Sequence, residues 1–276
     1  MKQKILEGPS GVLALLLLPY ICTMLLNGAE NALLNRGFNP ELFLPAVVAA
    51  EISPNYEKET IKSQAVIART NFYRKKNSPD GFRNYIKDVS SRYNYAASFF
   101  NIFPDVYEKA VTETEGKVLT FQGKLKLVPY HEISAGKTRD GQEILHSDAY
   151  TYLKPVDSSA DKNASDYYSI IYINKSRLPK SLTIKKRDSC SYVTELDADG
   201  NIIEGEAFRK GMGLSSSNFT IQETGEKVRF LCRGKGHGLG FSQYGGNELA
   251  KNKSTYEEIL KTYFPAMNVE NIYQVE

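Results

Sequence analysis

The hydrophobic pattern of the chain begins with one long apolar run. Lys2 and Lys4 precede residues 11–28, which are rich in leucine and carry no charge. A helix of about 18 residues, at about 1.5 Å per residue, spans roughly 27 Å, close to the ~30 Å hydrocarbon core of a bilayer. Asn27-Gly28-Ala29 makes a poor signal-peptide cleavage site. We therefore expect a cytoplasmic segment 1–10, a retained single-pass membrane anchor 11–28 and an extracytoplasmic domain 29–276, with a cleaved signal as the alternative.

The next stretch of the chain has a helical pattern. A short apolar lead, 45–50, ends at Glu51, and Ser53-Pro54 then supplies an N-cap hydroxyl and a proline suited to the first helical position. Gln64 and Arg69 lie on or beside an apolar face whose residues recur at helical spacing: Ile61, Ala65, Ala68 and Phe72. The pattern predicts a helix that begins at Ser53-Pro54 and buries this face in a core.

Beyond about residue 117 the pattern changes to short runs with strand character, separated by turn residues. The expected strands are 118–121, 125–130, 168–173, 182–185, 191–196, 219–222 and 228–232, with turns at Gln122-Gly123 and Asp199-Gly200. The polar segment 150–165 is expected to be a long surface loop. Helices first and strands later indicate an α+β fold. We expect a mixed domain in which a helix-containing part and a β-rich part border a cleft, with a loop or inserted subdomain around 140–230.

Composition and charge exclude some classes of protein. The net charge of +3 is small and evenly scattered, which argues against a nucleic-acid-binding surface and allows only a weak attraction to anionic polymers. The three cysteines, Cys22, Cys190 and Cys232, show no CxxC spacing, which argues against a zinc knuckle. The sequence leaves open whether Cys190 and Cys232 pair or are buried as free thiols.

Glu51 is the first candidate for chemistry. Apolar surroundings raise the pKa of a carboxylic acid, which can then donate a proton at neutral pH. Glycosidic bond cleavage requires such an acid. On spacing alone, a glutamate that stabilises the N-terminus of the following helix is the simpler interpretation.

Two further clusters of polar residues accompany it. Residues 130–138 place His131, Ser134, Lys137 and Thr138 at the end of a predicted strand, where binding sites are commonly displayed. Residues 233–245 place polar side chains among alternating glycines: His237, Ser242, Gln243 and Tyr244. This second cluster fits neither GxxxxGK[ST] nor GxGxxG, so it is no phosphate loop. A metal site made of His131, His146 and His237 is a further possibility, although the sequence has no HExxH motif.

Taken in order, these motifs resemble the domain of stage II sporulation protein D, which also occurs in amidase-enhancer proteins of bacterial walls. The resemblance covers most of the chain after the apolar run and rests on residues 47–54, 62–70, 130–138, 214–216 and 236–245. The last segment, Gly236 to Gly245, is the most specific.

The resemblance implies a peptidoglycan lytic transglycosylase. Its glutamate at the position of Glu51 is the catalytic acid, and its members cleave peptide-free glycan between N-acetylmuramic acid and N-acetylglucosamine to leave a 1,6-anhydro end. Arg69 is then expected to orient the carboxylate or bind substrate. The other expected substrate-binding residues are Thr70, His131, Ser134, Lys137, Thr138, His237, Ser242, Gln243 and Tyr244.

The resemblance also bears on cofactors and partners. Some members bind zinc with cysteines after the first histidine motif, whereas this chain has Arg139, Gly141 and Gln142 there, so we expect no metal and no cofactor. The expected partners are peptidoglycan glycan strands, a peptidoglycan amidase and a membrane scaffold of the engulfment machinery, and no nucleic acid. The competing function is a non-catalytic wall-binding protein that activates an amidase.

Overall fold

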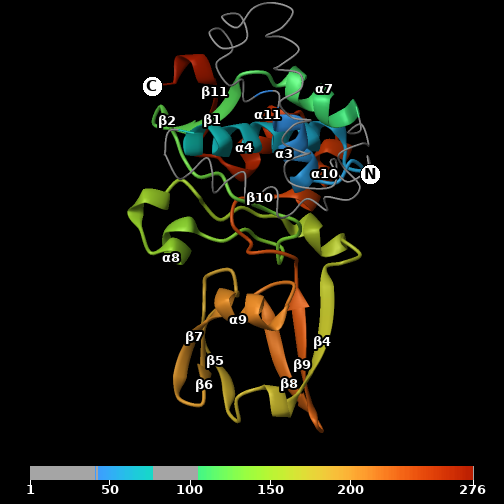
Figure 1. The fold of residues 1–276 in the computed structure, drawn as a ribbon, viewed down its shortest axis with the longest axis vertical. Helices are drawn as coiled ribbons and strands as arrows, with labels where there is room; N and C mark the ends of the chain where they lie inside the picture. The colour runs from blue at the N-terminus through green and yellow to red at the C-terminus, as the bar shows by residue number, and fades with distance from the viewer. Residues whose placement is uncertain (1–40, 42, 77–104, 276) are drawn as a thin grey trace, which may run out of the picture. The chain divides into compact units, whose positions relative to one another are not determined.

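The computed structural model describes residues 41, 43–76 and 105–275 (Figure 1). The predicted anchor, 11–28, lies outside these residues. Within the described ranges no helix is both long and apolar enough to cross a membrane. Residues 44–276 form one compact unit, and its mixture of helices and sheets confirms the α+β class. The predicted boundaries at residues 10 and 28 and the subdomain around 140–230 stay predictions.

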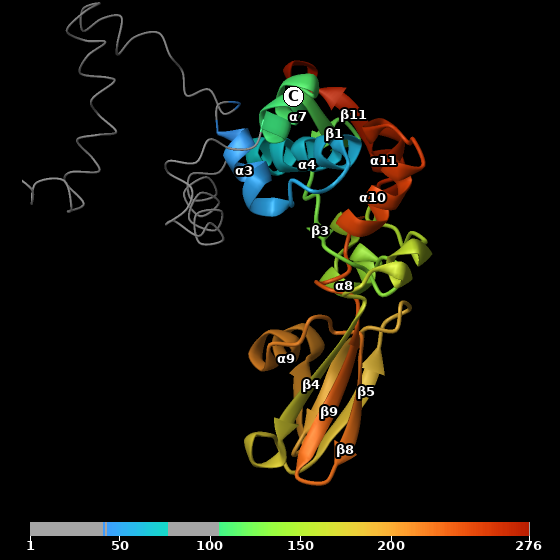
Figure 2. The ribbon, with the colours of Figure 1, turned by 90° about the vertical axis from the view of Figure 1, so that its right-hand side faces the viewer.

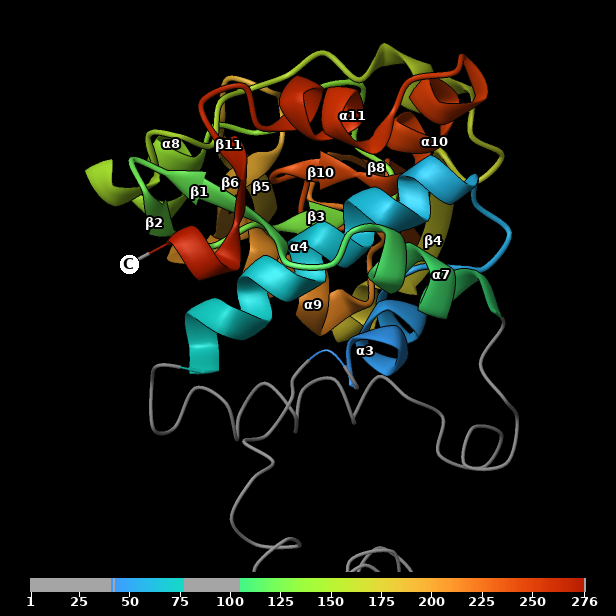
Figure 3. The ribbon, with the colours of Figure 1, turned by 90° about the horizontal axis from the view of Figure 1, so that it is seen from above.

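The described helices of this unit are α3 (Leu44–Glu51), α4 (Lys58–Lys76), α7 (Asp105–Glu113), α8 (Gly141–Leu145), α9 (Gly205–Met212), α10 (Gln243–Lys251) and α11 (Tyr256–Tyr263). Of these, α3, α7, α10 and α11 pack around α4. Seen from above, α4 runs between α3 and α7 on one side and α10 and α11 on the other (Figure 3). The predicted apolar face of α4 is confirmed, because Ile61, Ala65, Ala68 and Phe72 are all completely buried. This helix therefore provides the frame on which the neighbouring elements pack.

The start of α4 differs from the prediction. The apolar lead is itself a helix, α3, and α4 begins at Lys58 rather than at Ser53-Pro54. The Ser53 hydroxyl accepts from the backbone N–H of Asn55 at 3.3 Å, which holds a turn in place of a helix start. The backbone N–H of Glu57 instead donates to Oδ1 of Asn247 at 2.7 Å. A side chain distant in sequence therefore fixes where α4 begins.

Within the described residues the strands form four small sheets. Their bounds are β1 (Lys117–Phe121), β2 (Lys124–Leu125), β3 (Tyr130–His131), β4 (Tyr168–Asn174), β5 (Leu182–Arg187), β6 (Val193–Ala198), β7 (Asn201–Glu204), β8 (Phe219–Thr224), β9 (Lys227–Arg233), β10 (Phe241–Ser242) and β11 (Asn268–Asn271). The sheet orders are β11-β1-β2, β10-β3, β4-β9-β8 and β5-β6-β7. The predicted turns are confirmed, since Gln122, Gly123, Asp199 and Gly200 all have positive φ. The predicted strand 125–130 is wrong in its middle, because only its ends pair with other strands.

The sheets β4-β9-β8 and β5-β6-β7 share one apolar core with α9 (Figure 2). Alternate residues of each strand point into this core, among them Phe219, Val228 and Phe230. Cys232 is completely buried in it as a free thiol, and half-buried Cys190 is also free. The thiol of Cys232 is therefore a packing group without access to solvent.

Residues 150–165 are not the surface loop that their polarity predicts. Tyr152 and Leu153 are buried in the same core as α11. Hydrogen bonds attach the segment to residues 136–141; the backbone N–H of Thr138, for example, donates to Val156 O at 2.9 Å. Asp161, in a 3-10 helix (Ser159–Asn163), is also completely buried. The segment therefore has two sides: Ser158 and Asp161 are buried, whereas its other polar side chains, such as Lys154 and Lys162, face water.

Candidate active site

Glu51 is the last residue of α3, next to α4. Leu44, Val47 and Val48 pack α3 into the core that it shares with α4, and the backbone N–H of Ile52 donates to Val48 O at 3.0 Å to close the helix. The Glu51 side chain is half-buried, and its Oε2 accepts a hydrogen bond from Nε2 of Gln64 at 2.7 Å. The packing of the two helices therefore decides where the carboxylate points.

Two glutamine amides position Glu51, one through its carboxylate and one through its backbone. Gln64, on α4, is completely buried, and Gln243, the first residue of α10, is 5% exposed. Nε2 of Gln243 donates to the backbone carbonyl of Glu51 at 2.8 Å and to Oε1 of Gln64 at 3.2 Å. Because Oε1 of Gln64 accepts from Gln243, Nε2 of Gln64 faces the carboxylate. The structure thus joins Glu51 to the glycine-rich motif through Gln243, as a common site requires.

Sequence reasoning assigned no function to Gln64. The sequence pattern places Gln64 on or beside the apolar face of the predicted helix and indicates no role for it. The sequence feature that could have identified Gln64 is its uncharged amide, which stands among residues that are otherwise apolar and buried. Such a group needs a hydrogen-bond partner in the core, because burying an unpaired amide costs about 1–3 kcal/mol.

The two other motifs meet in a short parallel sheet. Strand β10 pairs with β3, so that Phe241 lies opposite Tyr130 and Ser242 lies opposite His131. The backbone N–H of Tyr244 also donates to Glu132 O at 3.0 Å. Residues more than a hundred positions apart in sequence are therefore neighbours, and Gln243 follows directly from this sheet into α10.

The histidines of the two motifs face each other, with ring centroids 5.8 Å apart. His131 is 4% exposed; its Nδ1 lies 3.0 Å from Leu239 O, and its buried Nε2 has no partner among the described residues. Nδ1 of His237 accepts from the backbone N–H of Leu239 at 3.1 Å. Burial, and to a smaller extent the charge of His237, lowers the pKa of His131 to about 3. Burial likewise lowers the pKa of His237 to about 4, so both rings are neutral at pH 7.

This pair predicts a loss of stability in mild acid. The folded-state pKa values lie below the ordinary histidine value of about 6.5, so the unfolded chain binds more protons below that pH. Stability present above about pH 6.5 is lost as the pH falls towards the folded pKa values, by about 2 kcal/mol per histidine between pH 7 and pH 5. In urea denaturation, the free energy of unfolding should fall between pH 7 and pH 5 in both proteins. The fall in His131→Asn should be smaller than that in the wild type by the contribution of one histidine. Equal falls in the two proteins would contradict the prediction.

Asp161 forms hydrogen bonds with both motifs. The sequence did not indicate this residue, because its segment has the composition of a surface loop. Its Oδ2 accepts from the backbone N–H of Ser134 at 2.7 Å and from Oγ of Ser242 at 2.8 Å. Burial raises the pKa of Asp161, while hydrogen bonds from Ser134 and Ser242 oppose this shift. Ser242 Oγ also accepts from Gly245 N at 3.3 Å and so caps α10. Ser134 and Ser242 therefore anchor the loops, because both are completely buried.

The remaining predicted residues fall into two groups. Tyr244 and Lys137 have exposed surface: Tyr244 is half-buried beside Tyr167, and Lys137 is exposed. Thr138 is buried, and its Oγ1 accepts from Val156 N at 2.8 Å. Tyr56 also lies in this region, near Glu132 and Asp161. Burial, and then the charges of these two carboxylates, raises the pKa of Tyr56 to about 12.

Arg69 and Thr70 are completely buried in α4, with described contacts of a structural kind. The Arg69 guanidinium donates to Val111 O at 2.9 Å and to Lys117 O at 3.2 Å, which ties α4 to the end of α7 and to β1. Thr70 Oγ1 donates to Val66 O at 2.7 Å and accepts from Leu119 N at 2.8 Å. These contacts favour a supporting role over direct contact with substrate.

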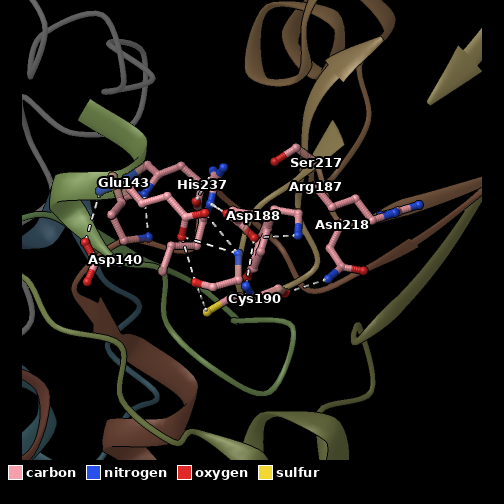
Figure 4. Close-up of polar contacts among 12 residues, drawn as sticks. Asp140, Glu143, Arg187, Asp188, Cys190, Ser217, Asn218 and His237 are labelled. Carbon is pink, nitrogen blue, oxygen red and sulfur yellow. Dashed lines mark hydrogen bonds and ion pairs between the residues drawn. The ribbon is translucent and has the colours of Figure 1, made fainter. Parts of the chain in front are cut away.

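The loop after His131 carries a buried ion pair. Arg139 Nε donates to Asp188 Oδ2 at 2.5 Å, and its side chain is 2% exposed. Figure 4 shows Asp188 at the centre of this network, near Cys190 and His237. A pocket of about 370 Å³ nearby is lined by Arg139, Glu206 and further charged residues. Within the described part of the chain no three His, Cys, Asp or Glu residues group as a metal site, which disfavours the three-histidine interpretation.

Comparison with known proteins agrees with these motifs. The family model described as stage II sporulation protein matches residues 33–121, which include Glu51 and Gln64. Stage II sporulation protein D of Bacillus subtilis (strain 168) is 27% identical over 255 residues, 83% of this chain and 74% of that protein. Its namesake from Bacillus amyloliquefaciens is 25% identical over 83% of this chain and 73% of its own length. The amidase enhancer of Bacillus subtilis (strain 168) is 22% identical over 80% of this chain and 39% of its own length.

The alignments with the two sporulation proteins extend well beyond the residues that the family model matches. They cover more than four fifths of the chain, and the model match itself includes the candidate acid. On these grounds the chain is similar to the stage II sporulation protein D family.

Proposed function

We propose that this protein is a lytic transglycosylase of peptidoglycan, with Glu51 as its acid and base. The single observation that carries the proposal is the fixed carboxylate of Glu51, which accepts from Gln64 at 2.7 Å and whose backbone accepts from Gln243 at 2.8 Å. A preorganised carboxylate at the meeting point of three sequence motifs is the arrangement that proton transfer to a bound substrate requires.

The proposed reaction needs one carboxylate and no water. Glu51 protonates the glycosidic oxygen of N-acetylglucosamine as the bond from C1 of N-acetylmuramic acid to that oxygen breaks. The 6-hydroxyl oxygen of the muramic acid then bonds to C1, and its proton passes to Glu51. The glutamate is thereby regenerated, and the product is a 1,6-anhydro sugar. Hydrolases require a second carboxylate to activate water or attack the sugar.

Nearby acids are poorly placed to be that second carboxylate. Asp161 is completely buried, and its Oδ2 is already engaged by Ser134 and Ser242. Glu132 forms an ion pair of 2.7 Å with Lys235. The proposed substrate-binding side chains are Lys137, His237, Gln243 and Tyr244, while Thr70, His131, Ser134, Thr138 and Ser242 hold the loops and Arg69 supports α4. No metal or cofactor enters the proposed reaction.

The cellular setting is part of the proposal. Residues 11–28 would anchor the protein in the cell membrane, with 1–10 in the cytoplasm and 29–276 outside as the catalytic domain. Similarity to sporulation proteins supports action on the cell wall during engulfment. An amidase that removes stem peptides and a membrane scaffold are the partners that this setting favours.

Mass spectrometry of products from peptide-free glycan strands tests the proposal. The full chain is expected to release fragments with 1,6-anhydro ends. Reducing ends would show a hydrolase and would overturn the one-carboxylate mechanism. No cleavage of strands that another lytic enzyme degrades would overturn the enzymatic proposal altogether.

The second candidate function is activation of an amidase without catalysis. The relative named amidase enhancer supports it, although only 39% of that protein aligns. An amidase assay with the Glu51→Gln protein distinguishes the two functions. An activator would still raise the rate of peptide removal by the amidase.

A further inference from the structure

The outer face of the sheet β4-β9-β8 is apolar and aromatic where it meets solvent. Tyr168, Ile170 and Tyr172 alternate along β4 and are 60%, 50% and 54% exposed. Their neighbours in β9 are Arg233, Leu231 and Arg229, directly opposite in the antiparallel register. The other face of the same sheet packs into the core with α9. We call the outward residues of β4 and β9 from 168 to 172 and from 229 to 233 the tyrosine–arginine face.

The charge of this face has one sign. Lys227, Arg229 and Arg233 point outward from β9, and the residues paired with Lys227 and Arg229 on β4 and β8 are Asn174, Tyr172, Gln222 and Thr224. Neither arginine forms an ion pair with any described residue. Arg187 of β5 donates to Phe219 O of β8 at 2.8 Å, and burial together with the nearby charge of Arg233 lowers the pKa of Arg187. An unpaired basic face is complementary to an anionic ligand.

The tyrosine–arginine face is continuous with the candidate active site. The ring of Tyr168 meets that of Tyr167 edge-on, with centroids 4.7 Å apart. Tyr167 packs in one apolar cluster with Ile133 and Tyr244, and its hydroxyl donates to Ala135 O at 3.1 Å. Tyr244 adjoins Gln243, which holds Glu51. Packed tyrosines, Tyr244, buried Tyr167 and exposed Tyr168, therefore link the region of Gln243 to the open sheet.

We propose that the tyrosine–arginine face binds the glycan strand beyond the cleavage site. Aromatic rings stack on the apolar faces of sugars, and arginine pairs with carboxylates in a bidentate manner. A strand without stem peptides carries a free lactyl carboxylate on every second sugar, so it offers both groups in alternation. Tyr168 and Tyr172 lie about 13 Å apart along the strand, at about 3.3 Å per residue, which exceeds the length of one sugar. The inference rests on the proposed function for the kind of ligand.

Binding of peptide-free strands to the Glu51→Gln protein tests this, because the strands then stay intact. Calorimetry should show about tenfold weaker binding for Tyr168→Ala/Tyr172→Ala and for Arg229→Gln/Arg233→Gln. The control Tyr273→Ala/Lys124→Gln removes an exposed tyrosine and an exposed charge from other surfaces and should bind as the parent does. Strands whose carboxylates are converted to methylamides should bind the parent about as weakly as the arginine variant binds natural strands.

The outcomes separate this inference from the proposed function. Loss of affinity in the face variants supports the face even if the wild-type protein leaves strands uncleaved. Affinities within about twofold of the parent in both variants overturn the face, whether or not the wild type cleaves. Unchanged glycan affinity with a change in sedimentation mass would assign the face to contact between two copies of the chain instead.

Discussion

Replacement of Glu51 by glutamine is expected to lower kcat for glycan cleavage by at least about 10³-fold while leaving the fold intact. The amide can still accept a hydrogen bond from Gln64 but cannot donate a proton to the leaving oxygen, and general acid–base catalysis contributes about 10²–10⁴-fold. The α3 packing does not depend on the charge, since Leu44, Val47 and Val48 carry it. Rates of formation of anhydro ends measure the effect.

Two further variants test whether the effect is specific to the Glu51 carboxylate and its orientation. Glu223→Gln removes a carboxylate whose side chain is 74% exposed in the pair with Lys175 and should cleave as the wild type does. Gln64→Leu keeps Glu51 but removes the amide donor, so kcat should fall about tenfold with KM changed less than about twofold, because orientation rather than binding is lost. Cleavage by Glu51→Gln within about tenfold of the wild-type rate would remove Glu51 as the acid.

Replacement of Arg139 by methionine is expected to lower the free energy of unfolding by about 3–5 kcal/mol, because it leaves the Asp188 carboxylate buried and unpaired. The Asp188 side chain is 1% exposed, and its Oδ1 accepts from the backbone N–H groups of Cys190 and Tyr192 at 2.9 and 2.8 Å. These bonds hold the carboxylate in place, so it cannot turn to water. Urea denaturation at pH 7 measures the loss.

The double variant Arg139→Met/Asp188→Asn identifies the cause. Asparagine keeps an acceptor for the two N–H groups and removes the charge, so the double variant should be more stable than Arg139→Met alone. Lys175→Met, which breaks an exposed ion pair of 2.6 Å with Glu223, should cost less than about 1 kcal/mol. An Arg139→Met protein as stable as Lys175→Met would show that the buried pair adds no net stability.

The motifs supplied most residues of the candidate site. Glu51, His131, His237 and Gln243 were selected because the residue types and their order are specific, and the pairing of β3 with β10 brings the two later motifs together. Arg69 and Thr70 were selected for the same reason, yet their contacts hold α4 to its neighbours. Motif membership thus does not distinguish a residue that touches the ligand from one that supports the fold.

Local pattern alone determined those features that depend on neighbours in sequence. The buried face of α4, the turns at Gln122-Gly123 and Asp199-Gly200, and the positions of β4, β8 and β9 all follow from periodicity and backbone preference. Each of these is decided within a few residues, where spacing and the need for positive φ leave few alternatives.

Only the tertiary structure decided the features that depend on distant partners. The start of α4 is set by Asn247, and Glu51 is positioned by Gln64 and Gln243. Asp161 accepts hydrogen bonds from two serines in other segments. The physical reason is the same in each case: a buried polar group must find its hydrogen-bond partner in space, and local sequence does not specify which distant residue supplies it.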